Sequence, residues 1–246
     1  MFHFKHFSLY HENSALKIST DAVLLAAVTP VEGVRTLLDI GCGCGVIAYC
    51  LAWKMQEENA TMSETVTQKI TGIDIDKASV DEALKNLEIF PKTQRQEISF
   101  LQQSLQDFAP QQRKKFDLIV SNPPFFVDSL KPNTAQKNIS KHNDTLPFED
   151  LRDAVCQLLE PDGYFYLILP ANESEIFEQL SQDFLFKHHQ LQIQPTPSKP
   201  INRIITGYRL SPPTTSYKTE QLCLRNADGN MSEEYRNLTK EFLLSN

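Results

Sequence analysis

The sequence predicts an α/β fold with an open, mostly parallel, doubly wound sheet, on the strength of three observations. Short apolar segments alternate with helical segments at the spacing of βαβ units. A glycine-rich turn directly follows the first apolar segment, and a hairpin-like pair of segments ends the series. No internal repeat or second domain boundary interrupts it. We therefore expect one domain over residues 1–246, with an N-terminal segment (1–35), a core (36–210) and a C-terminal extension (211–246).

Seven segments are predicted to be strands, because each is a short apolar run bounded by turn or helix signals. Proline residues separate the last two, which we expect to pair as a hairpin. The seven are Thr36–Ile40, Lys69–Asp74, Glu97–Leu101, Phe116–Val120, Tyr164–Leu169, a segment around Leu191–Ile193, and Arg203–Tyr208.

Helices are predicted between the strands from apolar periodicity and capping residues. Ser19 or Thr20 is expected to cap the first helix, Asp76 the third and Asn172 the fifth. The expected helices are Ala22–Val28, Val46–Met55, Lys77–Phe90, Pro147–Glu160, Asn172–Phe184 and Glu233–Leu244. The polar segments Gln56–Gln68 and 127–146 are predicted to be a surface insertion and a long loop.

Composition narrows the functional class. The chain is 41% hydrophobic and 22% charged, as in ordinary globular proteins, and it has no apolar run of membrane-spanning length. Its N-terminus lacks the layout of a secretory signal, so we expect a cytoplasmic protein. Five cysteines without paired spacing predict no metal or redox site. A net charge of −7 disfavours broad nucleic-acid adhesion but leaves room for a local basic patch.

The glycine turn Gly41-Cys42-Gly43-Cys44-Gly45 lies between a strand and a helix, the context of a nucleotide-binding loop. Glycines allow close backbone approach, and the helix N-terminus offers N–H groups. A dinucleotide fingerprint needs glycine where Val46 stands, and the Lys-Ser/Thr pair of a phosphate-binding P-loop is absent. Neither diphosphate interpretation fits.

Two carboxylates suggest another ligand. Asp39 precedes the first glycine by two residues, where it would face a cationic amino group directly or through water. Asp74 ends the second strand, where it would accept hydrogen bonds from ribose hydroxyls. A ligand that combines a zwitterionic amino acid with a nucleoside is S-adenosylmethionine. Either Ser104 or Asp107, after the third strand, would contact its adenine.

The sequence Ser121-Asn122-Pro123-Pro124-Phe125-Phe126 follows the fourth strand. The prolines end the ladder and restrict Asn122 to an extended conformation. The Asn122 side-chain oxygen and the Pro123 carbonyl can accept the hydrogens of an exocyclic amine, while Phe125 or Phe126 stacks on its plane. The turn therefore predicts methyl transfer to a planar amine.

Together, these motifs resemble the amino-group-directed class I methyltransferases, which have a Rossmann-like fold. Four further segments make the chain similar to the bacterial tRNA1(Val) (adenine-37-N6)-methyltransferase family almost from end to end. They are Phe4–Phe7, Leu16–Asp21, Lys141–Phe148 and Glu234–Phe242. The chain departs from the family pattern where Ser104 replaces an aspartate and where Phe242-Leu243-Leu244 replaces an aromatic-rich triplet.

The resemblance implies direct in-line transfer from S-adenosylmethionine to the N6 amine of adenine 37, with no metal. The expected catalytic residues are Asn122, Pro123, Pro124 and Phe125. The expected cofactor-binding residues are Thr20, Asp39, Gly41, Cys42, Gly43, Gly45, Asp74, Ile75, Ser104, Leu105 and Asn122, and Lys17 and Asp21 would help Thr20 to close over the cofactor.

A tRNA partner would need a basic surface. The acid-free segment 129–143 supplies Lys131, Lys137, Lys141 and His142 beside the proposed catalytic turn. The Asn-Pro-Pro turn alone also fits rRNA guanine N2, release-factor glutamine and DNA adenine as acceptors. A protein that binds S-adenosylmethionine or RNA without turnover is the alternative outside enzymes. No oligomeric state is predicted.

Overall fold

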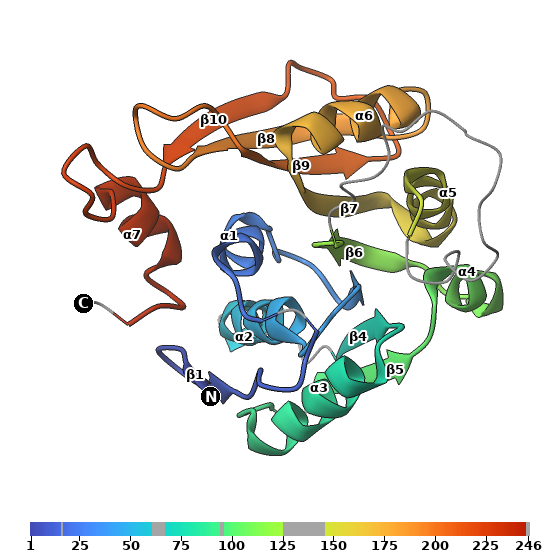
Figure 1. Cartoon of the computed structure of the whole chain (residues 1–246). Coiled ribbons are helices and arrows are strands. Elements are labelled where there is room, and N and C mark those ends of the chain that lie inside the picture. Colours follow the sequence, from blue (N-terminus) through green and yellow to red (C-terminus); the bar gives the residue numbers. More distant parts are fainter. Residues whose placement is uncertain (16, 61–66, 94–95, 125–145, 245–246) are drawn as a thin grey trace, which may run out of the picture.

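A central eight-stranded sheet organises the computed structural model, which describes residues 1–15, 17–60, 67–93, 96–124 and 146–244 (Figure 1). The strand order is β10-β8-β9-β7-β6-β3-β4-β5. The parallel part comprises β3 (Thr36–Ile40), β4 (Gln68–Asp74), β5 (Gln96–Gln102), β6 (Phe116–Ser121) and β7 (Leu159–Pro170). The predicted doubly wound α/β class is confirmed.

The other part of the sheet differs from the prediction in one strand. β8 (Phe186–Gln194) and β9 (Arg203–Arg209) form the expected antiparallel pair. Beyond them β10 (Lys218–Cys223) pairs in parallel with β8, so the sheet has eight strands rather than seven. Only Leu222 of β10 is fully buried. A polar edge strand of this kind adopts its conformation by pairing with its neighbour, and it contains no apolar run from which it could be predicted.

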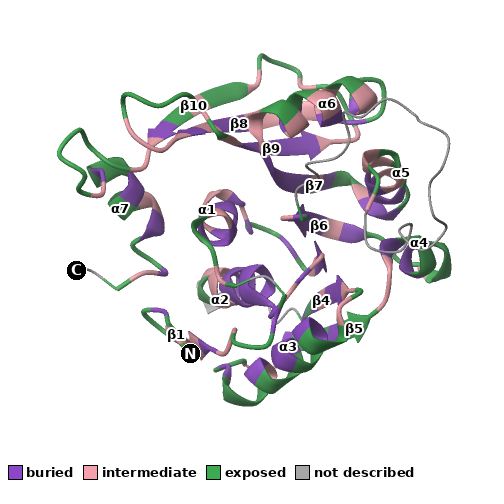
Figure 2. Cartoon of the chain, viewed as in Figure 1, coloured by how far each residue is buried: buried purple, intermediate pink, exposed green. Residues whose placement is uncertain are grey.

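Helices cover both faces of the sheet (Figures 1 and 2). One apolar cluster joins α1 (Thr20–Val28) and α2 (Val46–Ala60) to Leu37 and Leu118. The residues that follow these two in the chain, Leu38 and Ile119, belong to the cluster on the other face. Adjacent strand residues point to opposite faces, so a strand buried on both sides must be apolar throughout.

The remaining helices are α3 (Lys77–Ile89), α4 (Leu105–Phe108), α5 (Phe148–Leu158), α6 (Ala171–Ser181) and α7 (Glu233–Thr239), with a 3₁₀ turn η1 (Ala109–Gln111). Two predicted caps are confirmed. The Ala22 backbone N–H donates to Ser19 Oγ at 3.2 Å, and the Ser79 N–H donates to Asp76 Oδ2 at 2.8 Å.

Several boundary predictions are wrong. Helix α5 ends at Leu158 rather than Glu160, which belongs to β7, and α7 ends at Thr239 rather than Leu244. Helix α2 continues to Ala60, so the first residues of the expected insertion are helical, and Gln68 already belongs to β4. Gln68 can be buried although it is polar, because its side-chain amide donates to the carbonyl of Met55, the residue at which α2 was predicted to end. At α6 the N-cap is Pro170, and Asn172 lies inside the first turn, where it caps nothing.

The N-terminal segment begins with a small hairpin of β1 (Phe2–His3) and β2 (Ser8–Leu9). It is then fastened to α3 by the buried carboxylate of Glu82, which accepts from the Asn13 N–H at 3.0 Å and the Ser14 N–H at 2.8 Å. The Ala15 N–H donates to Ser79 Oγ at 3.2 Å. These contacts bring Ala15 to the edge where β3 and β4 end.

Candidate active site

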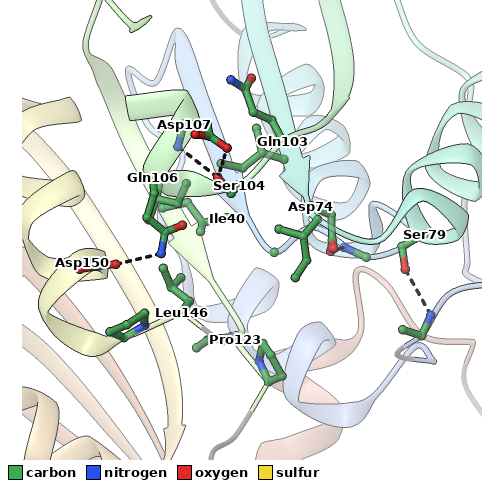
Figure 3. Close-up of a pocket in the computed structure, with 18 residues that line it drawn as sticks. Ile40, Asp74, Ser79, Gln103, Ser104, Gln106, Asp107, Pro123, Leu146 and Asp150 are labelled. Carbon is green, nitrogen blue, oxygen red and sulfur yellow. Dashed lines mark hydrogen bonds between the residues drawn. The ribbon is translucent and has the colours of Figure 1, made fainter. Parts of the chain in front are cut away.

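A cavity of about 1000 Å³ lies at the carboxyl ends of β3, β4, β5 and β6 (Figure 3). This edge of a doubly wound sheet is where such folds bind ligands. The lining residues come from the glycine loop, the ends of β4 and β6, and the starts of α4 and α5. They include Ala15, Gly41, Gly43, Asp74, Ile75, Ser79, Gln103, Ser104, Leu105, Gln106, Asp107, Pro123, Pro124, Leu146, Pro147 and Asp150.

The glycine loop is folded back against β4. The N–H groups of Gly41 and Cys42 both donate to the Ile73 carbonyl, at 2.9 and 3.0 Å. Gly45 has a φ of +82°, and a Cβ there would lie 2.8 Å from the Tyr49 ring. The position therefore requires glycine for both conformation and space.

Asp74 fixes the loop and faces the cavity. Its Oδ2 accepts from the Gly43 N–H at 2.8 Å and its Oδ1 accepts from the Asp76 N–H at 2.9 Å. A carboxylate has about four acceptor sites, so each oxygen retains capacity for a ligand hydroxyl. The two backbone bonds hold the carboxylate in one orientation, which suits recognition of two adjacent hydroxyls.

Asp39 lies beneath the loop rather than in the cavity wall. It is fully buried, and its Oδ2 accepts from the Ala48 N–H at 3.1 Å. Its Oδ1 has no hydrogen-bond partner among the described residues. Burial, opposed by the Ala48 bond, raises the pKa of this carboxyl to about 7. A cation bound at the loop would therefore stabilise the ionised form of a carboxylate that forms no ion pair with any described residue.

Ser104 and Asp107 both line the cavity, and they are bonded to each other (Figure 3). Ser104 Oγ caps α4 by accepting from the Asp107 N–H at 3.1 Å and donates to Asp107 Oδ2 at 2.6 Å. The hydroxyl proton is thus already used, whereas the second Asp107 oxygen can accept from an amine. Beside them, Ile75 is 49% exposed and Leu105 is 4% exposed, and they supply apolar contact for a planar ring.

The Asn122 turn is anchored to the loop strand. Ser121 Oγ donates to the Ile40 carbonyl at 2.9 Å, which ties the end of β6 to the residue before Gly41. Pro123 and Pro124 line the cavity, and Asn122 is half-buried. No hydrogen bond among the described residues engages the Asn122 side chain, so its amide is available to a ligand.

Some predicted site residues do not reach the cavity surface. Thr20 is an exposed residue at the start of α1, Cys42 and Gly45 are buried residues of the glycine loop, and Asn122 is not among the residues that line the cavity. Burial raises the pKa of the Cys42 thiol well above its usual range, which disfavours the nucleophilic thiolate form. Phe125 and the predicted RNA-binding residues Lys131, Lys137, Lys141 and His142 lie outside the described residues.

Sequence reasoning missed one pair in the wall. Gln106 Nε2 donates to Asp150 Oδ2 at 2.9 Å and so joins α4 to α5 in the wall of the cavity (Figure 3). The two residues are far apart in the chain, and neither belongs to a motif. Among the described residues no helix is long and apolar enough to cross a membrane, and no cluster of side chains is suited to a metal ion.

Comparison with known proteins agrees with the geometry. A family model described as a methyltransferase domain matches residues 33–236. A tRNA1(Val) (adenine(37)-N6)-methyltransferase from Bacteroides fragilis (strain YCH46) is 35% identical over 99% of this chain and 97% of its own. One from Pseudoalteromonas translucida (strain TAC 125) is 36% identical over 99% and 98%. The chain belongs to this methyltransferase family.

Two solved structures support the fold of this family member. A predicted O-methyltransferase from Agrobacterium tumefaciens has a TM-score of 0.64 at 16% identity, covering 90% of this chain and 96% of its own. The N-methyltransferase NodS from Bradyrhizobium japonicum WM9, in complex with S-adenosyl-L-homocysteine, has a TM-score of 0.52 at 16% identity, covering 77% and 85%. The predicted class I methyltransferase fold is confirmed.

Proposed function

We propose that this protein transfers the methyl group of S-adenosylmethionine to the N6 amine of adenine 37 in tRNA1(Val). One observation carries the proposal: Pro123 and Pro124, which directly follow Asn122, line the same cavity as Asp74 and the glycine loop. Family membership along nearly the whole chain supports the choice of acceptor. A tRNA substrate would place the activity in the cytoplasm.

The residues in and beneath the cavity wall suit S-adenosylmethionine in three places. Beneath the loop, the buried Asp39 oxygen that has no partner among the described residues favours a cation. The fixed carboxylate of Asp74 suits ribose hydroxyls, and Asp107, with Ile75 and Leu105 beside it, suits adenine. Of the two candidates for the adenine contact, we propose Asp107, because the Ser104 proton is already donated to it. Thr20, Cys42 and Gly45 would act indirectly, by holding the loop and its surroundings.

The chain's own contribution to the reaction is positional. The bound cofactor supplies an activated methyl group on a cationic sulfur, so no further leaving-group activation is needed. Asn122 Oδ1 and the Pro123 carbonyl would accept the two amine hydrogens and hold the nitrogen lone pair towards that methyl group. Correct orientation of two reactants is itself a large rate factor. The tie between Ser121 and Ile40 keeps this turn in register with the loop.

The acceptor adenine must leave its stack to reach the cavity, as bases do in enzymes that modify them. Phe125 remains our candidate for stacking on it, and Lys131, Lys137, Lys141 and His142 for binding the neighbouring phosphates. Pro124, which is exposed and lines the cavity, would form the described part of the entrance.

The test is methyl transfer from labelled S-adenosylmethionine to unmodified bulk tRNA, followed by nuclease digestion and identification of the nucleoside. Asn122→Ala should lose transfer while cofactor binding survives. Asn237→Ala, the same change at an exposed position on α7, is the matched control. Transfer to rRNA or to a protein glutamine instead would refute the proposed acceptor. Cofactor binding without transfer to any of these would favour a binding protein.

A further inference from the structure

One segment of the chain contains basic residues but no acidic residue. Between residues 184 and 219 there is no aspartate or glutamate, although the whole chain has 31 acids in 246 residues. The segment carries five cationic residues, Lys187, Lys199, Arg203, Arg209 and Lys218. It contains β8, β9 and the first two residues of β10. The turn between β8 and β9 is called the β8–β9 turn (residues 195–202).

The β8–β9 turn lies at the same edge of the sheet as Asn122. β9 runs antiparallel to β7, with Arg203 opposite Pro170, so the turn stands where the parallel strands end. In the strand order β9 is two strands and β8 three strands from β6 (Figure 1). At about 4.8 Å between neighbouring strands, the turn begins roughly 10–15 Å from the end of β6. That is one or two nucleotides from a base held at Asn122.

The turn is pre-organised rather than loose. The Lys199 N–H donates to the Thr196 carbonyl and the Asn202 N–H to the Ile193 carbonyl, both at 3.0 Å. The Gln194 amide donates to the carbonyls of Pro197 and Lys199. Proline at positions 195, 197 and 200 further restricts the backbone. The Lys199 side chain is exposed at this fixed turn.

Arg203 holds the base of the turn. Its Nε donates to Asp21 Oδ2 of α1 at 2.8 Å, and its Nη1 donates to the Asn202 carbonyl at 2.9 Å. The charge of Arg203 is therefore partly balanced by Asp21, whereas Lys199 has no acid beside it in its own segment. The cavity at the same end of the sheet is acidic instead, because Asp74, Asp107 and Asp150 line it.

We propose that the β8–β9 turn binds the phosphate backbone of the substrate RNA beside the methylated base, with Lys199 as its principal contact. The inference rests on the proposed function, since it takes RNA as the substrate. A cation on a fixed turn, one or two nucleotides from the base held at Asn122, can bind a backbone phosphate. Such contacts set the register of the RNA on the protein without reading its sequence. The acidic half of the edge repels the same backbone and leaves the cavity to the cationic cofactor.

The test compares Lys199→Glu and Lys199→Gln with Lys218→Glu. Lys218 belongs to the same acid-free segment and is exposed. It is the first residue of β10, so it lies at the end of the strands opposite to the β8–β9 turn. The full-length variants are assayed for tRNA affinity by fluorescence anisotropy across salt concentrations, for KM and kcat, and for binding of S-adenosylmethionine. Thermal denaturation checks that all three remain folded.

We expect Lys199→Glu to raise the Kd and KM for tRNA at least about 10-fold and Lys199→Gln about 3- to 5-fold, with kcat and cofactor binding unchanged. The salt slope of tRNA binding should fall by about 1 in Lys199→Gln. Lys218→Glu should stay within about 2-fold of wild type. Equal effects of the two Glu variants would overturn the proposal. If wild type binds tRNA through Lys199 but forms no methylated product, the surface stands and the proposed reaction fails.

Discussion

Replacing Asp39 by Asn should alter the pH dependence of both folding stability and cofactor binding. The carboxyl is fully buried, and one of its oxygens has no partner among the described residues. Its pKa is raised from 3.8 to about 7, mainly by burial. Asn has nearly the same shape, but it cannot ionise and so removes the buried charge at every pH.

The sign follows from which state holds the proton. Because the folded-state pKa is raised, the folded chain keeps the Asp39 proton at pH values where the unfolded chain has lost it. The contribution of Asp39 to wild-type stability therefore falls as pH rises from about 4 to about 7 and levels off above it. The shift to about 7 corresponds to about 4 kcal/mol. Against this, Asn leaves an amide N–H₂ unpaired, a pH-independent cost of about 1–3 kcal/mol.

Urea unfolding of wild type and Asp39→Asn between pH 5 and pH 8, without cofactor, measures this difference. The variant should gain about 3 kcal/mol relative to wild type across the range, since most of the 4 kcal/mol window lies there. Calorimetric titration should show wild-type affinity for S-adenosylmethionine weakening below pH 7, because Asp39 must release its proton. In the variant, binding should be weak and flat with pH. A stability difference that does not change with pH, together with unimpaired binding at pH 8, would show that Asp39 neither has a raised pKa nor contributes to cofactor binding.

Two further experiments test the glycine loop and the cavity wall. Gly45→Ala should lower the free energy of unfolding by about 1–2 kcal/mol because of its positive φ and by a further 1–3 kcal/mol because of the clash with Tyr49. It should also weaken cofactor binding. The control Gly33→Ala, also at positive φ but in open space, should show only the first cost in thermal unfolding. A double-mutant cycle with Gln106→Ala and Asp150→Ala should show a coupling free energy of about 0.5–1.5 kcal/mol in S-adenosylmethionine binding. Strictly additive effects would mean that the hydrogen bond between these two side chains does not shape the site.

The parallel half of the fold could be predicted because its strands are buried on both faces, which makes them continuous apolar runs. β10 could not, because its polar residues adopt a strand only by pairing with β8. Helix α2 likewise extends beyond Met55 without an apolar signal, and residue Gln68 is strand because buried amide bonds satisfy it. Local patterns carry no information about such tertiary partners.

The candidate site divides in the same way. The glycine loop, Asp74 and the Asn122 turn are motif residues, and all three contribute to one edge of the sheet. The position of Asp39 beneath the loop and the Gln106–Asp150 bond depend on how strands and helices pack, so no spacing reveals them. The preference for Asp107 over Ser104 became visible only from the bond between them.

The most direct test of the account is the methylation of unmodified tRNA by wild type and Asn122→Ala, with the product nucleoside identified by mass. We expect N6-methyladenosine from wild type, and no product from a variant that still binds S-adenosylmethionine. Turnover retained in Asn122→Ala would contradict the role of the turn. A different methylated nucleoside from wild type would contradict the proposed acceptor.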